Sequence, residues 1–295
     1  MSSPQEDIKV IDVMNYLWRE KDLNDLATAE EPIISDMVAG AIKSGKPPQT
    51  FIYDEDFIRS MDEIGYDKLF ITGLRMFSHR NKKMIHDVSI DEVYEQVRKF
   101  PDRLIGVICY NPFRIEESLR DIEKGVKEYG FKYVYFHSLG FNLPVNDKKL
   151  YPCYAKCNEL GIPVSMQVGH SAELMPSEGG RPIYLDDVAL DFPNLTIVAS
   201  HTGWPWVEEL VAMSMKHSNI YCDISAWPPR NFATWQGPLL RFMDTRRGRE
   251  KVIFGTNCRG LEGLKEYKEE FLQLQLKDET KRKIGYENAV KLFNL

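Results

Sequence analysis

The 295-residue chain lacks the features that mark several protein classes. No apolar run approaches the about 20 residues that span a bilayer, and the start, MSSPQEDIKV, has neither the basic nor the apolar region of a signal peptide. The net charge of -6 gives no general attraction for nucleic acid or for an anionic membrane. We therefore expect a cytoplasmic protein without nucleic-acid or membrane partners.

Cysteine is scarce, and one familiar glycine motif is missing. The five cysteines are an odd number and are widely scattered, so we expect buried thiols rather than disulfides. No G-x-G-x-x-G follows the first apolar run, so the usual nucleotide-binding mark of a doubly wound open sheet is absent. A doubly wound open sheet remains the structural alternative to a barrel.

What the sequence does contain is a regular alternation of apolar runs and amphipathic stretches. The runs are nearly continuous in β-branched and aromatic residues, as in strands that are covered on both faces of a parallel sheet. Patterns typical of helices lie between them, for example at 89–100, 115–130 and 204–217, the first with Ser89 as its N-cap. The eight expected strands are 8–13, 68–73, 103–110, 131–137, 162–168, 195–200, 219–225 and 251–256.

Eight strands, each followed by a helix, in a chain of this length predict an α/β fold with a single (β/α)8 TIM-barrel domain over residues 1–295. The segment 17–50 is too long for an ordinary loop after the first strand. We expect it to cover the barrel mouth or to meet a second subunit in a homo-oligomer, a dimer. The tail 277–295 is typical of one or two closing helices.

Candidate site residues are those at the C-terminal ends of the strands, where TIM barrels carry their chemistry. His137, His170 and His201 lie at the ends of three neighbouring strands and should converge on one side of the mouth. Neutral imidazole can act there as an acid/base or as a metal ligand. The competing interpretation is that each is a hydrogen-bonded structural histidine.

Two loops add further candidates. In GHSAE, Glu173 stands three residues after His170, so on a helical turn both could touch one ion or substrate, unless Glu173 is simply solvated. Arg181 could clamp a carboxylate, although a surface salt bridge is the commoner role. In SHTGWPW, Trp204 follows His201, and we expect Trp18, Trp204 and Trp227 to wall an apolar pocket for a small molecule.

At this point the chain resembles the amidohydrolase-related family, in the branch that contains resorcylate decarboxylase, aminocarboxymuconate-semialdehyde decarboxylase and pyrone-dicarboxylate lactonase. FPNLTIVASHTGWPW (192–206) is similar to that family's FP-x-L-x-I-V-x-x-H-x-G-x-P-W stretch. NIYCDISAW (219–227), KVIFGTN (251–257) and LYPCYAKCNELGIPVSMQVGH (150–170) resemble other parts of it. The resemblance implies hydrolysis or decarboxylation of a small carboxylated, aromatic or cyclic substrate.

The site that this resemblance implies is only partly present. Asp12 and His201 match the family's first-strand aspartate and sixth-strand histidine. The first-strand histidine pair falls on Met14 and Tyr16, another histidine falls on Gln167, and the last aspartate falls on Asn257. Thioether, phenol and carboxamide groups are poor ligands for zinc or manganese. We therefore do not expect the usual metal site.

Three functions stay open on the sequence. The first is an amidohydrolase-like hydrolase or decarboxylase with His201 as acid/base, helped by His137 and His170. Its substrate would be bound by Asp12, Tyr16, Gln167, Arg181, Trp204 and Asn257. The second is a non-heme iron redox enzyme with a displaced site of His137, His170, His201 and Glu173 or Glu178. The third is a non-catalytic ligand-binding barrel. The expected cofactor is accordingly either none or a displaced divalent metal, iron or zinc.

Overall fold

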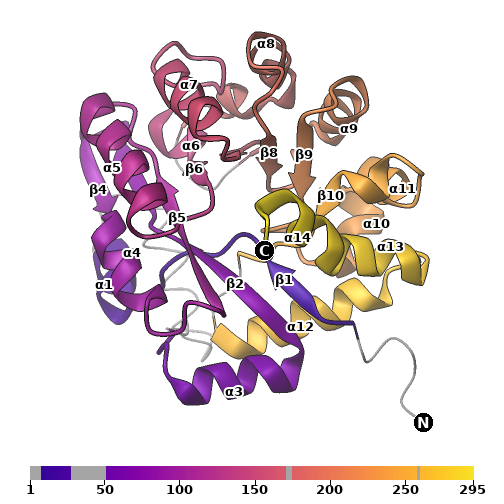
Figure 1. Cartoon of the computed structure of the whole chain (residues 1–295). Coiled ribbons are helices and arrows are strands. Elements are labelled where there is room, and N and C mark those ends of the chain that lie inside the picture. The colour runs from indigo at the N-terminus through magenta and orange to yellow at the C-terminus, as the bar shows by residue number, and fades with distance from the viewer. Residues whose placement is uncertain (1–7, 28–50, 171–174, 258–259) are drawn as a thin grey trace.

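The computed structural model describes residues 8–27, 51–170, 175–257 and 260–295. Eight parallel strands form one curled sheet in the order β1-β2-β5-β6-β7-β8-β9-β10, with helices around it (Figure 1). The expected α/β barrel is confirmed, and each strand falls within or overlaps its expected run. The strands are β1 (Val10–Asp12), β2 (Tyr66–Thr72), β5 (Leu104–Cys109), β6 (Val134–Phe136), β7 (Val164–Gln167), β8 (Ile197–Ser200), β9 (Ile220–Asp223) and β10 (Val252–Ile253).

Backbone hydrogen bonds close the sheet between its first and last strands. Just beyond the ends of β1 and β10, the Val13 N–H donates to the Phe254 carbonyl at 3.0 Å. The Asn257 N–H donates to the Met14 carbonyl at 2.8 Å. These two hydrogen bonds join the two edges of the sheet just beyond the ends of the strands.

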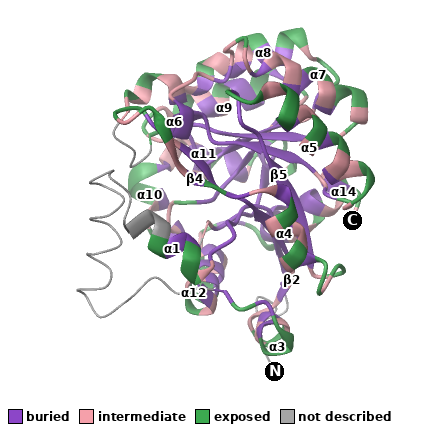
Figure 2. Ribbon diagram, turned by 90° about the vertical axis from the view of Figure 1, so that its left-hand side faces the viewer, coloured by how far each residue is buried: buried purple, intermediate pink, exposed green. Residues whose placement is uncertain are grey.

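The helices cover the outside of the barrel. Figure 2 shows buried strands enclosed by helices whose outer faces are exposed. The expected N-cap is confirmed, because the Ser89 side chain accepts the Glu92 N–H in a full capping box. The main helices are α1 (Glu20–Ala27), α3 (Glu55–Ile64), α4 (Ile90–Val97), α5 (Ile115–Lys127), α6 (Ser138–Phe141), α7 (Tyr151–Leu160), α8 (Leu185–Asp191), α9 (Val207–Lys216), α10 (Phe232–Trp235), α11 (Gly237–Met243) and α12 (Gly260–Gln273).

The expected C-terminal closing helices are present, and they cover the end of the barrel at which the strands begin. They are α13 (Asp278–Arg282), a π-helical turn (Lys283–Glu287) and α14 (Asn288–Phe293), and α14 lies across the centre of the ring in Figure 1. The Asn288 side chain donates to the carbonyl of Val252, the first residue of β10, at 2.7 Å. The opposite end, where the strands finish, is therefore the end open to chemistry.

A β-hairpin of β3 (Arg75–Ser78) and β4 (Lys83–Asp87) follows β2 and was not predicted. It packs over the loop after β5, where the ring centroids of Phe77 and Phe113 are 5.0 Å apart. Buried Arg75 anchors it, donating to the Cys109 carbonyl at 2.8 Å and pairing with Asp87 at 3.0 Å. The hairpin thus extends one side of the barrel mouth.

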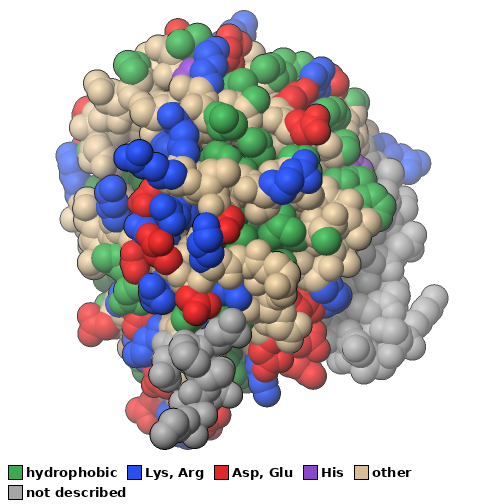
Figure 3. Space-filling model, turned by 90° about the vertical axis from the view of Figure 1, so that its right-hand side faces the viewer, with side chains coloured by type: hydrophobic (Ala, Val, Ile, Leu, Met, Phe, Trp, Pro, Cys, Tyr) green, Lys and Arg blue, Asp and Glu red, His purple; other side chains and the backbone are tan. Residues whose placement is uncertain are grey.

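Charges on the outer surface are mixed in sign. Figure 3 views the side on which α11 and α13 lie, and Lys and Arg side chains stand there beside Asp and Glu. Ion pairs such as Arg249–Glu279 at 2.9 Å and Lys277–Asp244 at 3.5 Å account for this pattern. None of the helices that the structure describes is both long and apolar enough to cross a membrane.

Candidate functional site

His201 stands directly after β8 in an unusual backbone conformation. His201, Thr202 and Gly203 have φ values of 75°, 61° and 72°, so three successive residues occupy the left-handed region. Two of them are not glycine, and such conformations gather at functional sites. They turn the chain sharply at the strand end, and α9 consequently begins at Val207 rather than at the expected 204. The His201 side chain is left at the C-terminal end of the barrel and is 5% exposed.

A chain of buried hydrogen bonds fixes the His201 imidazole. The Ser225 hydroxyl donates to Asp223 Oδ1, and the same oxygen accepts the main-chain N–H of His201 at 3.2 Å. Asp223 Oδ2 accepts the Ser200 hydroxyl at 2.6 Å, and Ser200 in turn contacts Ser165 at 2.7 Å. The Ser225 oxygen also lies 2.6 Å from His201 Nδ1. Because the only proton of this hydroxyl goes to Asp223, Nδ1 must be the donor, and Nε2 is then the basic nitrogen of the neutral ring.

A second polar network joins three of the predicted residues from three strands. The hydroxyl of Tyr16, beyond β1, lies 2.7 Å from the hydroxyl of Tyr135 on β6. The Tyr135 hydroxyl also reaches Gln167 Oε1 on β7 at 3.4 Å and His137 Nδ1 at 3.5 Å. Tyr135 was missed by sequence reasoning. The signal was present, because Tyr133, Tyr135 and His137 alternate along one strand and so share the face toward the barrel interior.

Asp12 ties the first strand to the last. One of its carboxyl oxygens accepts the N–H groups of Met14 at 3.1 Å and Thr256 at 2.9 Å. The other accepts the Thr256 hydroxyl at 2.6 Å and the Asn15 amide at 3.3 Å. Burial raises the pKa of Asp12 to about 7, although these hydrogen bonds act in the opposite direction. The carboxyl group stabilises barrel closure, and substrate binding by Asp12 stays a prediction.

Asn257 faces the same end of the barrel from beyond β10, with a left-handed φ of 57°. Its side-chain Oδ1 is buried and has no hydrogen-bond partner among the residues that the structure describes. A buried acceptor of this kind is costly unless a ligand or water satisfies it. Binding of a substrate oxygen by Asn257 stays a prediction, and a substrate hydroxyl could donate to this Oδ1.

The rim of the mouth carries an aromatic group. Trp204 lies 4.9 Å from Trp227, 5.5 Å from Trp235 and 5.8 Å from His170, measured between ring centroids. The main-chain N–H of His170 donates to the Trp204 carbonyl at 2.6 Å. The exposed His170 side chain has its Nδ1 3.0 Å from the Ser177 hydroxyl. Two of the three tryptophans expected to wall the pocket are therefore in contact. The third, Trp18, packs on Tyr16 at 5.5 Å.

Arg181 is engaged in an ion pair. Its guanidinium donates through Nε to Glu209 at 3.1 Å, contacts Glu178 at 3.4 Å and lies 6.0 Å from the Trp206 ring. A substrate carboxylate would have to compete with Glu209 for this group. The predicted clamp therefore stays a prediction, and Glu173, the other charged candidate of this region, lies outside the described residues.

At the positions where the resemblance implies metal ligands, the side chains differ from the imidazole and carboxylate groups that zinc prefers. Met14 is fully buried, and the Tyr16 hydroxyl is hydrogen-bonded to Tyr135. Gln167 and Asn257 offer neutral amides in place of the imidazole and carboxylate groups that bind zinc. Across residues 8–27, 51–170, 175–257 and 260–295, no three His, Cys, Asp or Glu side chains are grouped so as to hold a metal.

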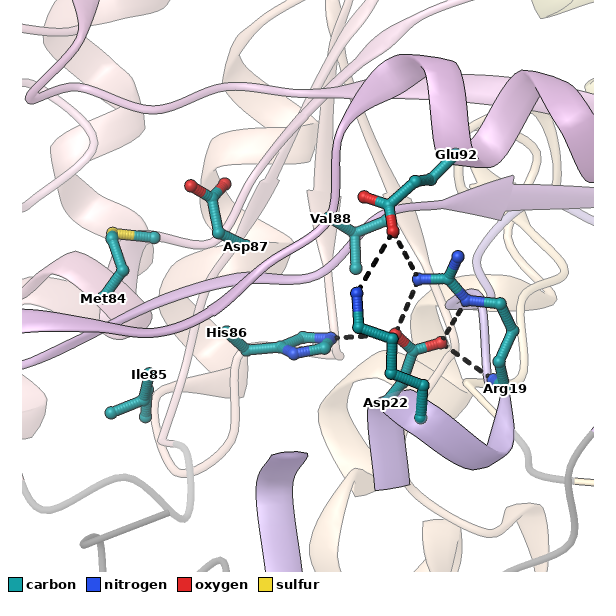
Figure 4. Close-up of a pocket in the computed structure, with 9 residues that line it drawn as sticks. Arg19, Asp22, Met84, Ile85, His86, Asp87, Val88 and Glu92 are labelled. Carbon is teal, nitrogen blue, oxygen red and sulfur yellow. Dashed lines mark hydrogen bonds and ion pairs between the residues drawn. The ribbon is translucent and has the colours of Figure 1, made fainter. Parts of the chain in front are cut away.

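A separate pocket of about 130 Å³ lies between α1 and β4 (Figure 4). Asp22 is 1% exposed and pairs with Arg19 Nε at 2.8 Å and with His86 Nε2 at 3.6 Å. Arg19 also reaches Glu92 at 3.0 Å, and Lys21 lies 3.6 Å from the same carboxylate. The charges in this pocket are thus paired with one another, which favours a structural role.

Comparison with known proteins identifies the family of this chain and similar solved structures. Residues 75–295 match the family described as Amidohydrolase. A TIM-barrel protein of unknown function from Bordetella bronchiseptica is 22% identical, with a TM-score of 0.71 over 97% of this chain and 98% of its own. No curated protein matches the chain.

Two crystal structures of decarboxylases are also similar, each 17% identical with a TM-score of 0.69. One is 5-carboxyvanillate decarboxylase from Novosphingobium aromaticivorans with manganese and 4-hydroxy-3-methoxy-5-nitrobenzoic acid, covering 100% of both chains. The other is dihydroxybenzoic acid decarboxylase from Polaromonas sp. JS666 with manganese and the inhibitor 2-nitroresorcinol, covering 97% of both chains. At these identities the likeness shows a shared fold.

Proposed function

The chain belongs to the amidohydrolase family, and from this premise we propose that it is a carbon–carbon lyase that decarboxylates a small hydroxylated aromatic acid. The solved structures of this fold that bind nitrobenzoic acid or nitroresorcinol support the substrate class. The observation that carries the proposal is the His201–Ser225–Asp223 hydrogen-bond chain, which would hold His201 as an oriented acid/base at the barrel mouth.

His201 would act as the acid. In its imidazolium form it delivers the Nε2 proton to the ring carbon that bears the carboxylate. The bond from that carbon to the carboxylate then breaks, its electron pair returns to the ring, and carbon dioxide leaves. Water restores the proton to Nε2, so the net change consumes one proton for each carboxylate lost. Asp223 stabilises the charged imidazole through the Ser225 hydroxyl, which also fixes its orientation.

The remaining residues would hold the ring in place. Tyr16 and Gln167 offer donors to substrate oxygens, and the buried Asn257 Oδ1 offers an acceptor to a substrate hydroxyl. The tryptophans at the rim supply apolar surface for an aromatic ring. A hydroxyl on the substrate ring would donate electron density to the ring carbon that accepts the proton.

Manganese has no part in this proposal, because Met14, Tyr16, Gln167 and Asn257 form an unsuitable donor set. A displaced iron or zinc site on His137, His170, His201 and Glu173 stays a prediction. In that case His201 would have to bind metal through Nε2, since Nδ1 is engaged with Ser225.

The test is a set of reactions with protein purified without an affinity tag. Dihydroxybenzoates, 5-carboxyvanillate and a small cyclic lactone are each incubated with the protein, and carbon dioxide release and lactone opening are measured separately. The proposal predicts carbon dioxide release from at least one hydroxybenzoate. Lactone opening alone would assign hydrolysis in its place, and no turnover of any compound would refute the proposed substrate class.

A further inference from the structure

Tyr135 occupies a central position among the candidate residues. It lies on β6 and is fully buried, and its hydroxyl contacts side chains that come from β1, β6 and β7. The contact with Tyr16 at 2.7 Å is a strong hydrogen bond. Those with Gln167 at 3.4 Å and His137 at 3.5 Å are at the long limit of hydrogen bonding. The phenol pair is therefore the dominant interaction.

We propose that Tyr135 is a positioning residue that holds the Tyr16 hydroxyl as a hydrogen-bond donor to an anionic oxygen of the substrate. The inference rests on the proposed function and deepens it, because it assigns the group that binds a phenolate or carboxylate oxygen. Tyr16, supported by Tyr135, would thus bind an oxyanion at the position where the resemblance implies a metal ligand.

Two physical arguments support this role. Burial raises the pKa of Tyr135 well above its ordinary value, so the phenol stays protonated and remains a donor. When Tyr16 gives its proton to an anionic oxygen, Tyr135 can direct its own proton to Tyr16, since its other contacts are long. Each hydrogen bond in such a chain polarises the next, and both are strengthened in a buried environment.

The neighbouring Tyr133 supplies a matched control on the same strand. It is also buried, but its hydroxyl donates to the main-chain carbonyl of Val13, and its ring packs on Phe70 and Phe293. Replacing either tyrosine with phenylalanine removes one buried hydroxyl from β6 and keeps the ring. Only Tyr135→Phe removes a hydroxyl that contacts Tyr16.

The experiment uses 2-nitroresorcinol as the probe, because its absorbance reports whether the phenol is ionised. The pKa of the bound probe is measured by pH titration in wild type, Tyr135→Phe and Tyr133→Phe. Hydrogen-bond donors to the phenolate lower the pKa of the bound probe. We therefore expect Tyr135→Phe to raise that pKa by about one unit, which corresponds to about tenfold weaker binding of the phenolate relative to the neutral phenol. Tyr133→Phe should leave it at the wild-type value, even if both variants are equally destabilised.

Two further variants, Tyr16→Phe and the double variant Tyr16→Phe/Tyr135→Phe, test whether Tyr135 acts through Tyr16. Adding Tyr135→Phe to Tyr16→Phe should cause no further shift of the probe pKa, because the two hydroxyls act in one chain. Additive shifts, or the same shift in Tyr135→Phe and Tyr133→Phe, would overturn the inference while leaving the proposed function intact. Failure of wild type to bind the probe would instead count against the proposed substrate class, and with it the inference.

Discussion

The polar cluster at the ends of the strands and the charged pocket beside α1 differ in how they satisfy buried polar groups. In the pocket, Asp22, Arg19 and Glu92 form ion pairs, so each charge already has its partner. At the mouth, neutral hydroxyls and an imidazole are oriented toward one end of the barrel, and Asn257 Oδ1 lacks a described partner. Saturated charges stabilise a fold, whereas oriented groups with remaining capacity can bind a substrate.

The largest expected effect lies at the mouth. His201→Ala should lower the rate of decarboxylation by about 10²-fold or more, because it removes the proposed acid. Steady-state kinetics measure the rate of both variants. His217→Ala is the control, because His217 directly follows α9 and pairs with Asp186 of α8. The account would be wrong if the His201 variant turned over as fast as the control.

The next effect lies in the pocket and concerns stability. Asp22→Asn should reduce the free energy of unfolding by about 1.5–3 kcal/mol, because the buried Asp22 loses its charge-assisted hydrogen bonds to Arg19, which keeps only Glu92 as its partner among the described residues. Urea denaturation measures it. Lys21→Ala is the matched control and should change stability by less than about 0.5 kcal/mol, since its side chain is 68% exposed. Equal effects of the two changes would remove the distinction between buried and exposed charges in this pocket.

Glu92 adds a pH dependence to the same pocket. Burial opposes its charged form, but the Ser89 N–H and Arg19 outweigh burial and lower its pKa to about 2, from an ordinary 4.5. A lowered pKa stabilises the fold above pH 4.5, and this contribution is lost as the pH falls from 4.5 toward 2. The stability difference between wild type and Glu92→Gln should therefore shrink by about 1–2 kcal/mol between pH 6 and pH 3. A difference that is constant with pH would contradict the assigned ion pair.

The smallest effect is expected at the position where the resemblance implies a metal ligand. Met14→Leu preserves the volume of a buried apolar side chain and should cost less than about 1.5 kcal/mol of stability. It should leave turnover unchanged, because the thioether has no chemical role in the proposal. Loss of activity together with loss of bound metal in this variant would show that residue 14 does serve the site.

The fold could be predicted from the sequence because its signals are local. Long β-branched runs gave all eight strands, and Ser89 gave a helix start. The hairpin of β3 and β4 could not be predicted in this way, since RMFS and KMIHD lack a continuous β-branched run and the hairpin is held by distant partners of Arg75.

The site was predictable only in part. Strand ends selected His201, Tyr16 and Gln167, because position along a strand can be read from sequence. The partners of these residues depend on contacts across the barrel. Tyr16 and Tyr135 are 119 positions apart in the chain, and no pattern within either segment pairs them. The same holds for Asp12 and Thr256, which are 244 positions apart.

An oriented histidine and paired phenols are proposed to act at the mouth in place of a bound metal. This is tested by the rate of carbon dioxide release from a hydroxybenzoate substrate after the protein has been treated with a chelator and its metal content has been measured. The account predicts that metal-stripped protein keeps the wild-type rate and that added manganese does not raise it. A rate that falls with the metal content and returns with manganese would contradict it.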